Sequence, residues 1–432
     1  MAGTFDSSRR TFLSTSTAAA LGTVLSTRAG AARRSTAASV SNGIKIGLIG
    51  CGGRGTGAAI EALRGDSGAV LTAVGDVFED RMQKCLETLK KTQPEQTRVS
   101  GENRILGFEA YHKVIDSGVD AVLLATPPAF RPLHLEAAVA SGKHAFCECI
   151  AGVDAAGVRR FLAAAERAEQ QGLSIVSGFC WRYDNAARAV AEQIRAGRIG
   201  EVRAVYATYY RQSFTKKYGG ERRAEWSDLE WQIRDWPDFL WLGGDLNIGL
   251  SGGHSVDKIS WWLNDEMPIR AVGVGGREFP GEGNTFDHCE VNYEYANGVR
   301  TFLGVRTQDG CHNENCDYII GTTGVCTLGR GPVPEITGEN PWRYEGPMNR
   351  MHQAEQDAFM ASIRTGEPIH DGRRMAHTTL MAVMGRLAAY TGQEISCDQA
   401  FHSQENLVPE ELTWDTPIEL APPPHPGVTK FV

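Results

Sequence analysis

Three glycines near the start of the sequence have the spacing of a phosphate-binding turn. Gly50, Gly52 and Gly55 follow directly after a short apolar run, Ile44–Ile49. Gly50 would permit a tight turn from strand to helix, Gly52 a close approach of the backbone to a pyrophosphate, and Gly55 close packing of the helix on the strand. The phosphates would then bind the free N–H groups and the positive dipole end of the helix.

An acidic residue completes this pattern. Asp76 lies 21 residues beyond Gly55, at the end of the second apolar run. A strand, a glycine motif, a helix and an acid at this distance predict a dinucleotide site, whereas the glycines alone are also compatible with a surface loop. A carboxylate here accepts hydrogen bonds from ribose hydroxyls and repels a 2′-phosphate, which favours NAD over NADP. The adjoining Gly53 and Arg54 belong to the same predicted site.

The elements that must position this site alternate regularly. From Ile44 to about Ile150, apolar strand-like runs are separated by helical patterns, which predicts a doubly wound parallel sheet. Thr126 and Pro127 follow the third main strand, at the sheet edge over which a nicotinamide commonly passes. We therefore include both residues in the predicted cofactor site.

The pattern changes after about Gly178. Six strand-like runs follow, and Asn297-Gly298 between two of them predicts a hairpin turn. The expected fold class is α/β, with an N-terminal Rossmann-type sheet and a C-terminal α/β domain whose open sheet is mostly antiparallel. The expected organisation is a leader over 1–31, a linker over 32–42, a dinucleotide-binding domain over 43–178 and a substrate and oligomerisation domain over 179–432.

The first 31 residues have the features of an export signal. Ser8-Arg9-Arg10-Thr11-Phe12-Leu13 is a twin-arginine pattern, and a weakly apolar stretch leads to Ala29-Gly30-Ala31, a small-residue cleavage site. The alternative is a disordered basic tail. Export of a folded protein to the periplasm or beyond would require nucleotide to be acquired beforehand, which favours a tightly held cofactor.

The composition excludes several classes of partner. The chain has 432 residues, of which 42% are hydrophobic and 22% charged, and a formal net charge of −8. An acidic chain of this kind has no general attraction for nucleic acid or anionic membranes. No run after the leader reaches the ~18 apolar residues that would span a bilayer.

The ten cysteines form no recognisable metal pattern. Neither Cys147-x-Cys149 nor Cys311-x4-Cys316 belongs to a paired zinc motif, so we predict no metal site. Cys51 and Cys147 lie in apolar runs typical of buried thiols. In an exported chain, Cys311 and Cys316 have the spacing to close a small loop.

Several motifs in order along the chain resemble the Gfo/Idh/MocA oxidoreductases. They include IGLIGCGGRG, GDVFEDR, LLATPPAFRPLHLEAAVASGKHAFCE, GFCWRYDNAARAVAEQIRAGRIGEV and GGHSVDKISWW. The resemblance implies an N-terminal dinucleotide domain, a carbohydrate or polyol substrate, and an open C-terminal sheet that helps to form the substrate site and often an interface between subunits.

The catalytic motifs of that family are only partly present. A Glu-Lys-Pro motif is replaced by Glu148-Cys149-Ile150, so the glutamate remains at the cofactor site but the lysine that would stabilise an alkoxide is lost. An aspartate four residues before His254 is also missing, and Asp245 or Asn247 would replace it only in a shifted loop. His254 remains the candidate general base, because its ordinary pKa lies near neutrality. The alternative is a structural histidine at a helix start.

Other residues near these motifs are secondary candidates. Tyr183 is a possible acid or base beside Arg182, or else an aromatic that packs on the sheet. Cys149, Arg182 and Asp257 are expected to contact substrate. An aromatic-rich stretch suits the C–H faces of sugars but equally suits a core or subunit interface; it contains Trp226, Trp231, Trp236, Phe239 and Trp241.

Three functions are compatible with these features. The first is an exported NAD(P)-dependent oxidoreductase that acts on a sugar or sugar derivative. The second resembles glycoside hydrolase family 109, whose members use bound NAD for transient oxidation, elimination and hydration, and whose Cys-aromatic-Arg stretch is similar to Cys180-Trp181-Arg182. The third is a non-catalytic sugar- or nucleotide-binding protein.

Overall fold

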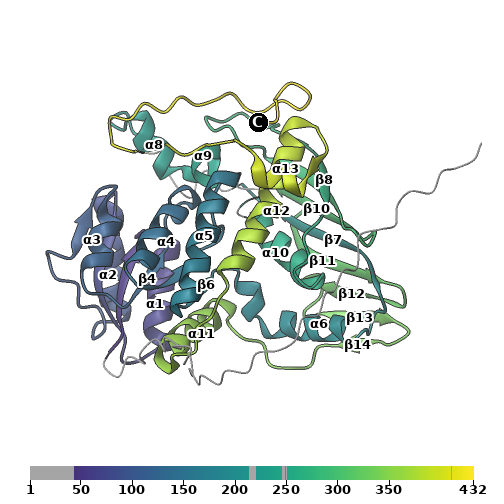
Figure 1. Ribbon diagram of the computed structural model, residues 1–432, viewed down its shortest axis with the longest axis horizontal. Coiled ribbons are helices and arrows are strands. Elements are labelled where there is room, and N and C mark those ends of the chain that lie inside the picture. Colours follow the sequence, from purple (N-terminus) through teal and green to yellow (C-terminus); the bar gives the residue numbers. More distant parts are fainter. Residues whose placement is uncertain (1–42, 214–219, 246–248, 250, 410) are drawn as a thin grey trace, which may run out of the picture. The chain divides into compact units, whose positions relative to one another are not determined.

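The computed structural model describes residues 43–213, 220–245, 249, 251–409 and 411–432. The predicted export signal lies outside these residues. Two sheets with their covering helices make up the described part of the chain (Figure 1).

The first sheet is parallel throughout, with strand order β3-β2-β1-β4-β5-β6. Its strands are β1 (Lys45–Ile49), β2 (Val70–Asp76), β3 (Arg104–Leu106), β4 (Ala121–Leu124), β5 (His144–Cys147) and β6 (Ile175–Ser177). This is the order of a doubly wound dinucleotide-binding sheet, with the direction of winding reversed between β1 and β4. The predicted fold class is confirmed.

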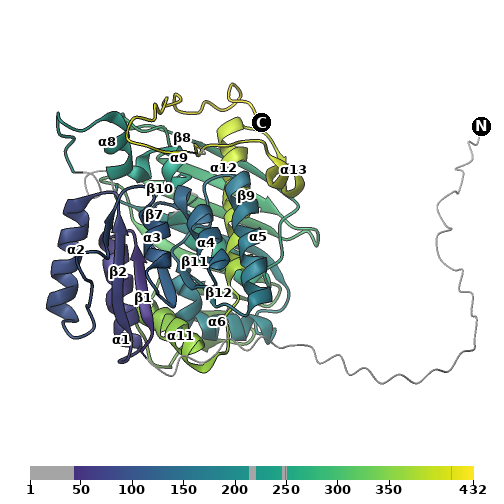
Figure 2. The same cartoon turned by 60° about the vertical axis from the view of Figure 1, so that its left-hand side comes forward.

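Helices cover both faces of this sheet because its strands are apolar on both sides. Leu48 on β1 and Leu123 on β4 pack toward one face, whereas Ile49 and Leu124 pack toward the other. The first face is covered by α1 (Gly53–Gly65), α2 (Glu79–Thr92) and the late helix α11 (Met351–Thr365). The second carries α3 (Ala110–Asp116), α4 (Arg131–Ala140) and α5 (Ala155–Gln171), as Figure 2 shows.

The second sheet has nine strands in the order β14-β13-β12-β11-β7-β10-β9-β8-β15. Its long strands are β7 (Val202–Arg211), β8 (Arg270–Gly276), β9 (His288–Glu294), β10 (Arg300–Thr307) and β11 (Glu314–Gly321); the short ones are β12 (Gly324–Leu328), β13 (Glu335–Gly338), β14 (Trp342–Arg343) and β15 (Ile395–Ser396). The predicted hairpin joins β9 to β10, and Gly298 has φ +85° there. One pair, β7 with β10, is parallel.

Helices pack on one face of the second sheet. They are α6 (Asn185–Arg195), α10 (Gly252–Trp262) and α12 (Gly372–Thr391), with α13 (Cys397–His402) against β15. The short helices η1 (Pro128–Phe130), η2 (Cys180–Tyr183), α8 (Asp228–Arg234), η3 (Trp236–Asp238) and α9 (Leu240–Gly243) lie in the connections.

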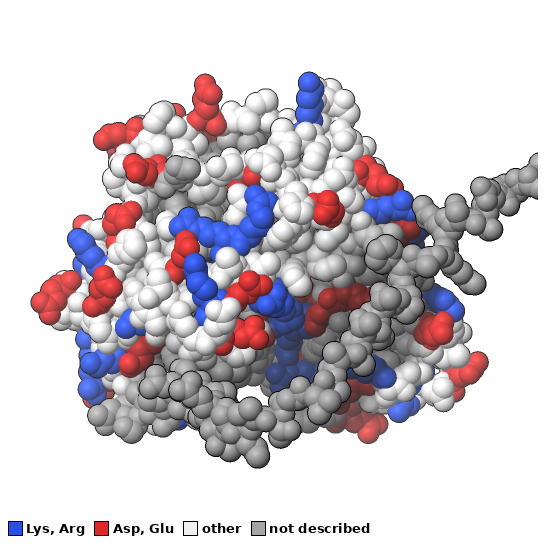
Figure 3. Space-filling view, in the orientation of Figure 1, with Lys and Arg blue, Asp and Glu red and all other residues white. Residues whose placement is uncertain are grey.

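The face of the molecule in Figure 3 has charges of both signs, and the cysteines are free thiols. Acidic and basic side chains are interspersed over the face shown in Figure 3. Among the described residues, no helix is long and apolar enough to cross a membrane. All ten cysteines are unbridged, and Cys316 is buried in β11 while Cys311 is exposed before it, so the possible small-loop disulfide is not formed.

Candidate functional site

A cavity of about 670 Å³ lies along the carboxyl edge of the parallel sheet. Most of the predicted cofactor residues line it, and they come from the connections that follow β1, β2 and β4: Gly50, Gly52, Gly53, Arg54, Asp76, Thr126 and Pro127. Gly55 and Glu148 lie outside its lining. A single cavity therefore brings together residues that the sequence separates by up to 77 positions.

Each of the three motif positions requires glycine for a different structural reason. Gly50 has φ +100°, and a Cβ there would lie 2.7 Å from the backbone of Ala125 and Thr126. A Cβ on Gly55 would lie 1.9 Å from the carbonyl oxygen of Gly50, so this glycine permits the helix to pack on the strand. A Cβ on Gly52 would meet nothing within 4 Å. The open space beside Gly52, at the start of α1, fits a pyrophosphate.

Asp76 is held in place by the turn that it faces. One carboxylate oxygen accepts a hydrogen bond from the Cys51 N–H at 2.6 Å, and the other accepts one from the Phe78 N–H at 2.9 Å. Burial raises the pKa of Asp76, while these N–H groups and the Arg81 charge oppose that rise. The carboxylate keeps lone pairs for ribose hydroxyls, since each oxygen can accept more than one hydrogen bond.

A buried arginine ties two of the edge loops together. The guanidinium of Arg131, which is 1% exposed, donates to the carbonyl of Thr126 at 2.6 Å and also to the carbonyl of Ile150. It thereby joins the loop after β4 to the loop after β5. The sequence motifs give no indication of this role, because Arg131 lies within an ordinary helical pattern.

Glu148, directly after β5, forms an ion pair with Arg54, which lines the cavity. Arg54 Nε lies 2.9 Å from Glu148 Oε1, and the same guanidinium also pairs with Glu61. Burial alone would lower the pKa of Arg54, but the two carboxylates raise it above its usual value. Glu148 thus fixes the arginine of the glycine motif, even though it does not line the cavity itself.

Cys149 and His254 are brought into contact across 105 residues of sequence. The Cys149 sulfur lies 3.5 Å from His254 Nε2, and the ring of Phe179 meets the imidazole edge-on. Burial, followed by the charge of His352, lowers the pKa of His254 to about 4. Burial and Glu148 raise the pKa of Cys149. Near neutral pH the pair is therefore an uncharged imidazole beside an uncharged thiol.

Arg182 and Asp257 meet each other in a buried network. Arg182 Nε lies 2.8 Å from Asp257 Oδ2, and Arg374 lies 3.2 Å from the other carboxylate oxygen. Thr378 also donates to Asp257 at 3.2 Å. These partners hold η2 and α12 against α10, and substrate contact by Arg182 and Asp257 remains a prediction.

Tyr183 has a fixed partner of its own. Its hydroxyl donates to Asp371 at 3.1 Å. Burial and the Asp371 charge raise the pKa of Tyr183, the opposite of the lowering that the sequence argument from Arg182 requires. Catalysis by Tyr183 remains a prediction.

Two residues are possible replacements for the missing aspartate before His254. Asp245 is buried and accepts a hydrogen bond from the Tyr390 hydroxyl, whereas Asn247 lies outside the described residues.

The aromatic-rich stretch packs beside the cofactor cavity. Trp226 stacks on Trp231, and Trp241 meets Phe130 edge-on, next to the loop after β4. Trp236 itself lines the cavity. The two alternatives for these rings are sugar binding and packing. The ring contacts of Trp226, Trp231 and Trp241 are those of packing, whereas Trp236 lines the cavity.

Comparison with known proteins shows the family. Residues 44–177 match the model of the Gfo/Idh/MocA oxidoreductase family with an NAD-binding Rossmann fold. An inositol 2-dehydrogenase of Burkholderia cenocepacia is 31% identical over 306 residues, which cover 68% of this chain and 76% of that protein. The chain belongs to the Gfo/Idh/MocA family of oxidoreductases.

Other similarities are partial or concern the fold. An inositol 2-dehydrogenase of Cereibacter sphaeroides is 33% identical over 176 residues, 40% of this chain, and the match spans about half (48%) of that relative. The crystal structure of the WlbA dehydrogenase from Bordetella pertussis, in complex with NADH and UDP-GlcNAcA, has a TM-score of 0.65 at 18% identity, covering 82% of this chain and 99% of that one. The latter similarity supports the fold alone.

Proposed function

We propose that this protein is an exported, NAD-dependent oxidoreductase that removes hydride from a sugar or a sugar-like polyol. The observation that carries the proposal is the Cys149–His254 contact at the end of β5, joined to the nucleotide cavity through the ion pair between Glu148 and Arg54. Relatives named as inositol 2-dehydrogenases support a polyhydroxylated ring as substrate.

The chain's own residues supply binding and proton transfer. Gly52 and the first turn of α1 would hold the pyrophosphate, and Asp76 the ribose hydroxyls. Bound NAD⁺ supplies the hydride acceptor. Neutral His254 would accept the proton of the substrate hydroxyl, which is the role of a general base. The carboxylate of Asp76 favours NAD over NADP.

The cysteine at position 149 favours one alternative. The glycoside hydrolase family 109 enzymes that the chain resembles also lack the lysine at this position, although the hydride transfer that begins their reaction is the same as in a dehydrogenase. The second candidate is therefore an NAD-dependent glycosidase that works by oxidation, elimination and hydration. A non-catalytic binding protein is the third.

A product assay distinguishes the three candidates. Purified protein is incubated with NAD⁺ and with panels of sugars, inositols and aryl glycosides, and both NADH and released aglycone are measured. Net NADH supports the dehydrogenase, and aglycone release without net NADH supports the glycosidase. An absence of both products across the panels, with NAD bound, would contradict catalysis.

The electrostatics of His254 predict an unusual pH profile. An ordinary histidine base would impose an acid limb near pH 6.5. Burial and the charge of His352 lower the pKa of His254 to about 4, so the imidazole stays neutral and active well below pH 6.5. We expect kcat/KM to fall only as the pH drops through about 4. A profile of kcat/KM from pH 3.5 to 8 measures this, and a limb near pH 6.5 would contradict the proposed environment.

Replacement of Cys149 by lysine should lower activity. A lysine ammonium would lie in a buried position beside neutral His254, and Glu148 already pairs with Arg54. Burial of an uncompensated charge costs ~3–5 kcal/mol. We expect Cys149→Lys to reduce kcat/KM and thermal stability, whereas Cys149→Ser, which is of similar size and neutral, retains most of both. Faster NADH production by Cys149→Lys would instead show that the site is a weakened form of the usual dehydrogenase.

We also propose periplasmic or secreted localisation. The support is the twin-arginine pattern at Arg9 and Arg10, followed by a small-residue cleavage site. Replacement of both arginines by lysine should leave folded, NAD-loaded protein in the cytoplasm, as cell fractionation would show. Normal periplasmic recovery of this double variant would exclude the twin-arginine route.

We also propose that copies of this chain associate through the second sheet to form a homo-oligomer. Apolar side chains stay exposed on this sheet, including Val274 at 67%, Val272 at 43% and Ile320 at 40%. Contact with another copy would remove this apolar surface from water. We expect sedimentation analysis to show an oligomer for the wild type and a smaller species for Val274→Lys. A monomeric wild type would contradict the expected association.

A further inference from the structure

Three metal-binding side chains converge next to the candidate site. Cys180 comes from η2, and His352 and Glu355 come from the first turns of α11, three residues apart and so on one face of the helix. Their ligand atoms all lie within 4.8 Å of one another. His352 Nδ1 lies 3.2 Å from Glu355 Oε1. The sequence spacing of 172 residues between Cys180 and His352 hides this cluster from motif analysis.

The cluster contains a buried acceptor without a donor. Glu355 is 0% exposed, and its Oε2 atom has no hydrogen-bond partner among the residues that the structure describes. A buried carboxylate oxygen without a partner is costly, and such an exception calls for an explanation such as a bound ion. The Cys180 thiol, 2% exposed, faces the same cluster.

The charges around the cluster favour a cation. The carboxylates of Glu148 and Glu61 both act on Glu355, and Arg54 is the positive group that opposes them. Arg54 is already engaged by Glu148 and Glu61. The cluster therefore offers three donor atoms, and the cation that acts on Glu355 is already paired with two other carboxylates.

We propose that Cys180, His352 and Glu355 bind a divalent transition metal of the zinc class. A thiolate, an imidazole and a carboxylate are ligands that zinc prefers, and three protein ligands with one open position are typical of zinc sites that bind water or substrate. Two nitrogen or oxygen ligands ~2.0–2.1 Å from zinc lie about 3.3 Å apart at a tetrahedral angle, close to the observed separation of His352 and Glu355.

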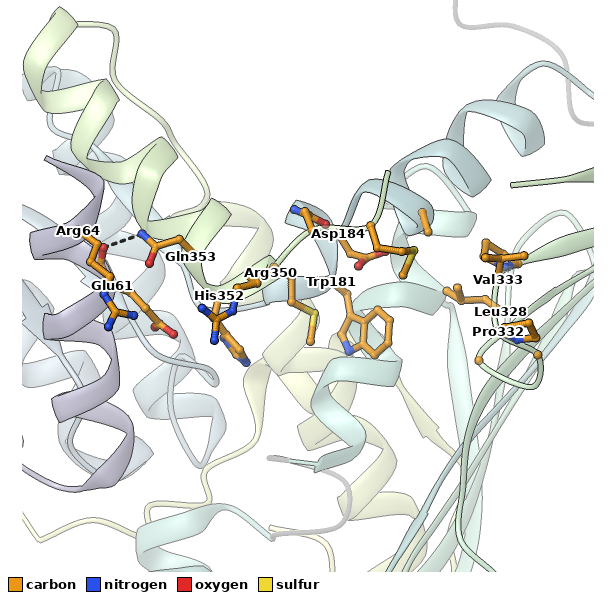
Figure 4. A pocket seen from close by; sticks show the side chains of 17 residues that line it. Glu61, Arg64, Trp181, Asp184, Leu328, Pro332, Val333, Arg350, His352 and Gln353 are labelled. Carbon is orange, nitrogen blue, oxygen red and sulfur yellow. Dashed lines mark hydrogen bonds between the residues drawn. The ribbon is translucent and has the colours of Figure 1, made fainter. Parts of the chain in front are cut away.

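An access route reaches the proposed metal. A cavity of about 470 Å³ lies between α1 and α11 on one side and η2 and the connection after β12 on the other, and His352 lines it (Figure 4). Trp181, next to Cys180, lines the same cavity. The open coordination position would thus face a space that admits water or a small polar ligand.

The metal would have a consequence for the chemistry. Cys180 directly follows Phe179, whose ring meets His254 edge-on, so the metal would place positive charge near His254 and replace the charge that a lysine would supply at position 149. This consequence rests on the proposed function, whereas metal binding itself does not.

Cobalt substitution tests the site directly. The purified full chain is treated with a chelator and titrated with Co²⁺, with absorption spectra recorded for the thiolate-to-metal band and calorimetry for affinity; Zn²⁺ is then added in competition. We expect one Co²⁺ per chain, a thiolate band, displacement by Zn²⁺ and tighter binding at higher pH, because the metal must displace protons from Cys180 and Glu355.

Matched variants separate a built site from adventitious binding. Cys180→Ser should remove the thiolate band, and the isosteric Glu355→Gln should weaken Co²⁺ binding by more than ~100-fold, beyond the ~10–100-fold typical of an outer-shell partner. Cys311→Ser, which removes an exposed thiol, should change neither. NAD titrations and thermal melts of each variant report folding and the nucleotide site separately. A thiolate band that survives Cys180→Ser, or equal affinity in wild type and Glu355→Gln, would overturn the proposal.

Discussion

The variant His254→Ala should lose most of the catalytic activity while it retains NAD. Loss of one general base typically lowers the rate by a factor of ~10²–10⁴. His254 is neutral, is half-buried and contacts Cys149, so its removal takes away the proton acceptor without disturbing the glycine turn at Gly50. Steady-state kcat/KM on one identified substrate and calorimetric NAD affinity give the two numbers to compare.

Tyr183→Phe is the informative companion variant. It removes only the hydroxyl that donates to Asp371, so we expect a stability loss of ~1 kcal/mol and little change in rate. Full activity in His254→Ala would leave the proposed mechanism without its proton acceptor, and a large loss of rate in Tyr183→Phe would assign that role to Tyr183 instead.

The variant Gly52→Val should abolish NAD binding without unfolding the protein. A Cβ on Gly52 would enter open space in the cavity, where the pyrophosphate would lie, and would meet no described atom within 4 Å. Its cost to the free energy of unfolding should be about 1 kcal/mol, because glycine is a favoured helix N-cap and valine is not. Calorimetry with NAD and a thermal melt measure both effects.

Two other glycines provide controls for this prediction. Gly55→Ala should reduce stability and binding together, because its Cβ would clash with the carbonyl of Gly50. Gly101→Val, at an exposed position with no atom within 4 Å of a Cβ, should change neither. Unchanged NAD affinity in Gly52→Val would show that the nucleotide does not bind at the start of α1.

Local sequence signals identified the parts of the site that are built from consecutive residues. The glycine turn depends on contacts between Gly50, Gly55 and the neighbouring strand, and its spacing is therefore visible in the sequence. The hairpin at Asn297-Gly298 is local for the same reason. The C-terminal sheet was predicted as mostly antiparallel, but no local signal indicates that β7 pairs in parallel with β10, since the two are about 90 residues apart.

Long-range juxtapositions could not be predicted in this way. The contact between Cys149 and His254 joins the end of one sheet to a helix that covers the other. The family resemblance pointed to both residues as site residues, but it did not indicate that their side chains touch. Arg131 donates to the backbone carbonyls of Thr126 and Ile150. Every residue has a backbone carbonyl, so the residue types at these positions give no indication of the contacts. The approach of Cys180 to His352 depends on the packing of α11 beside η2, two elements that the sequence places in different halves of the chain.

The most direct test of the central claim is a single-turnover measurement on NAD-loaded protein. Protein with bound NAD⁺ is mixed with a sugar, polyol or glycoside from the screening panel, and formation of enzyme-bound NADH is followed by its absorbance. Hydride transfer predicts rapid NADH formation in the wild type, whether or not net product accumulates later, and loss of that phase in His254→Ala at unchanged NAD occupancy. Full NAD occupancy without reduction by any member of the panel would contradict the proposed function.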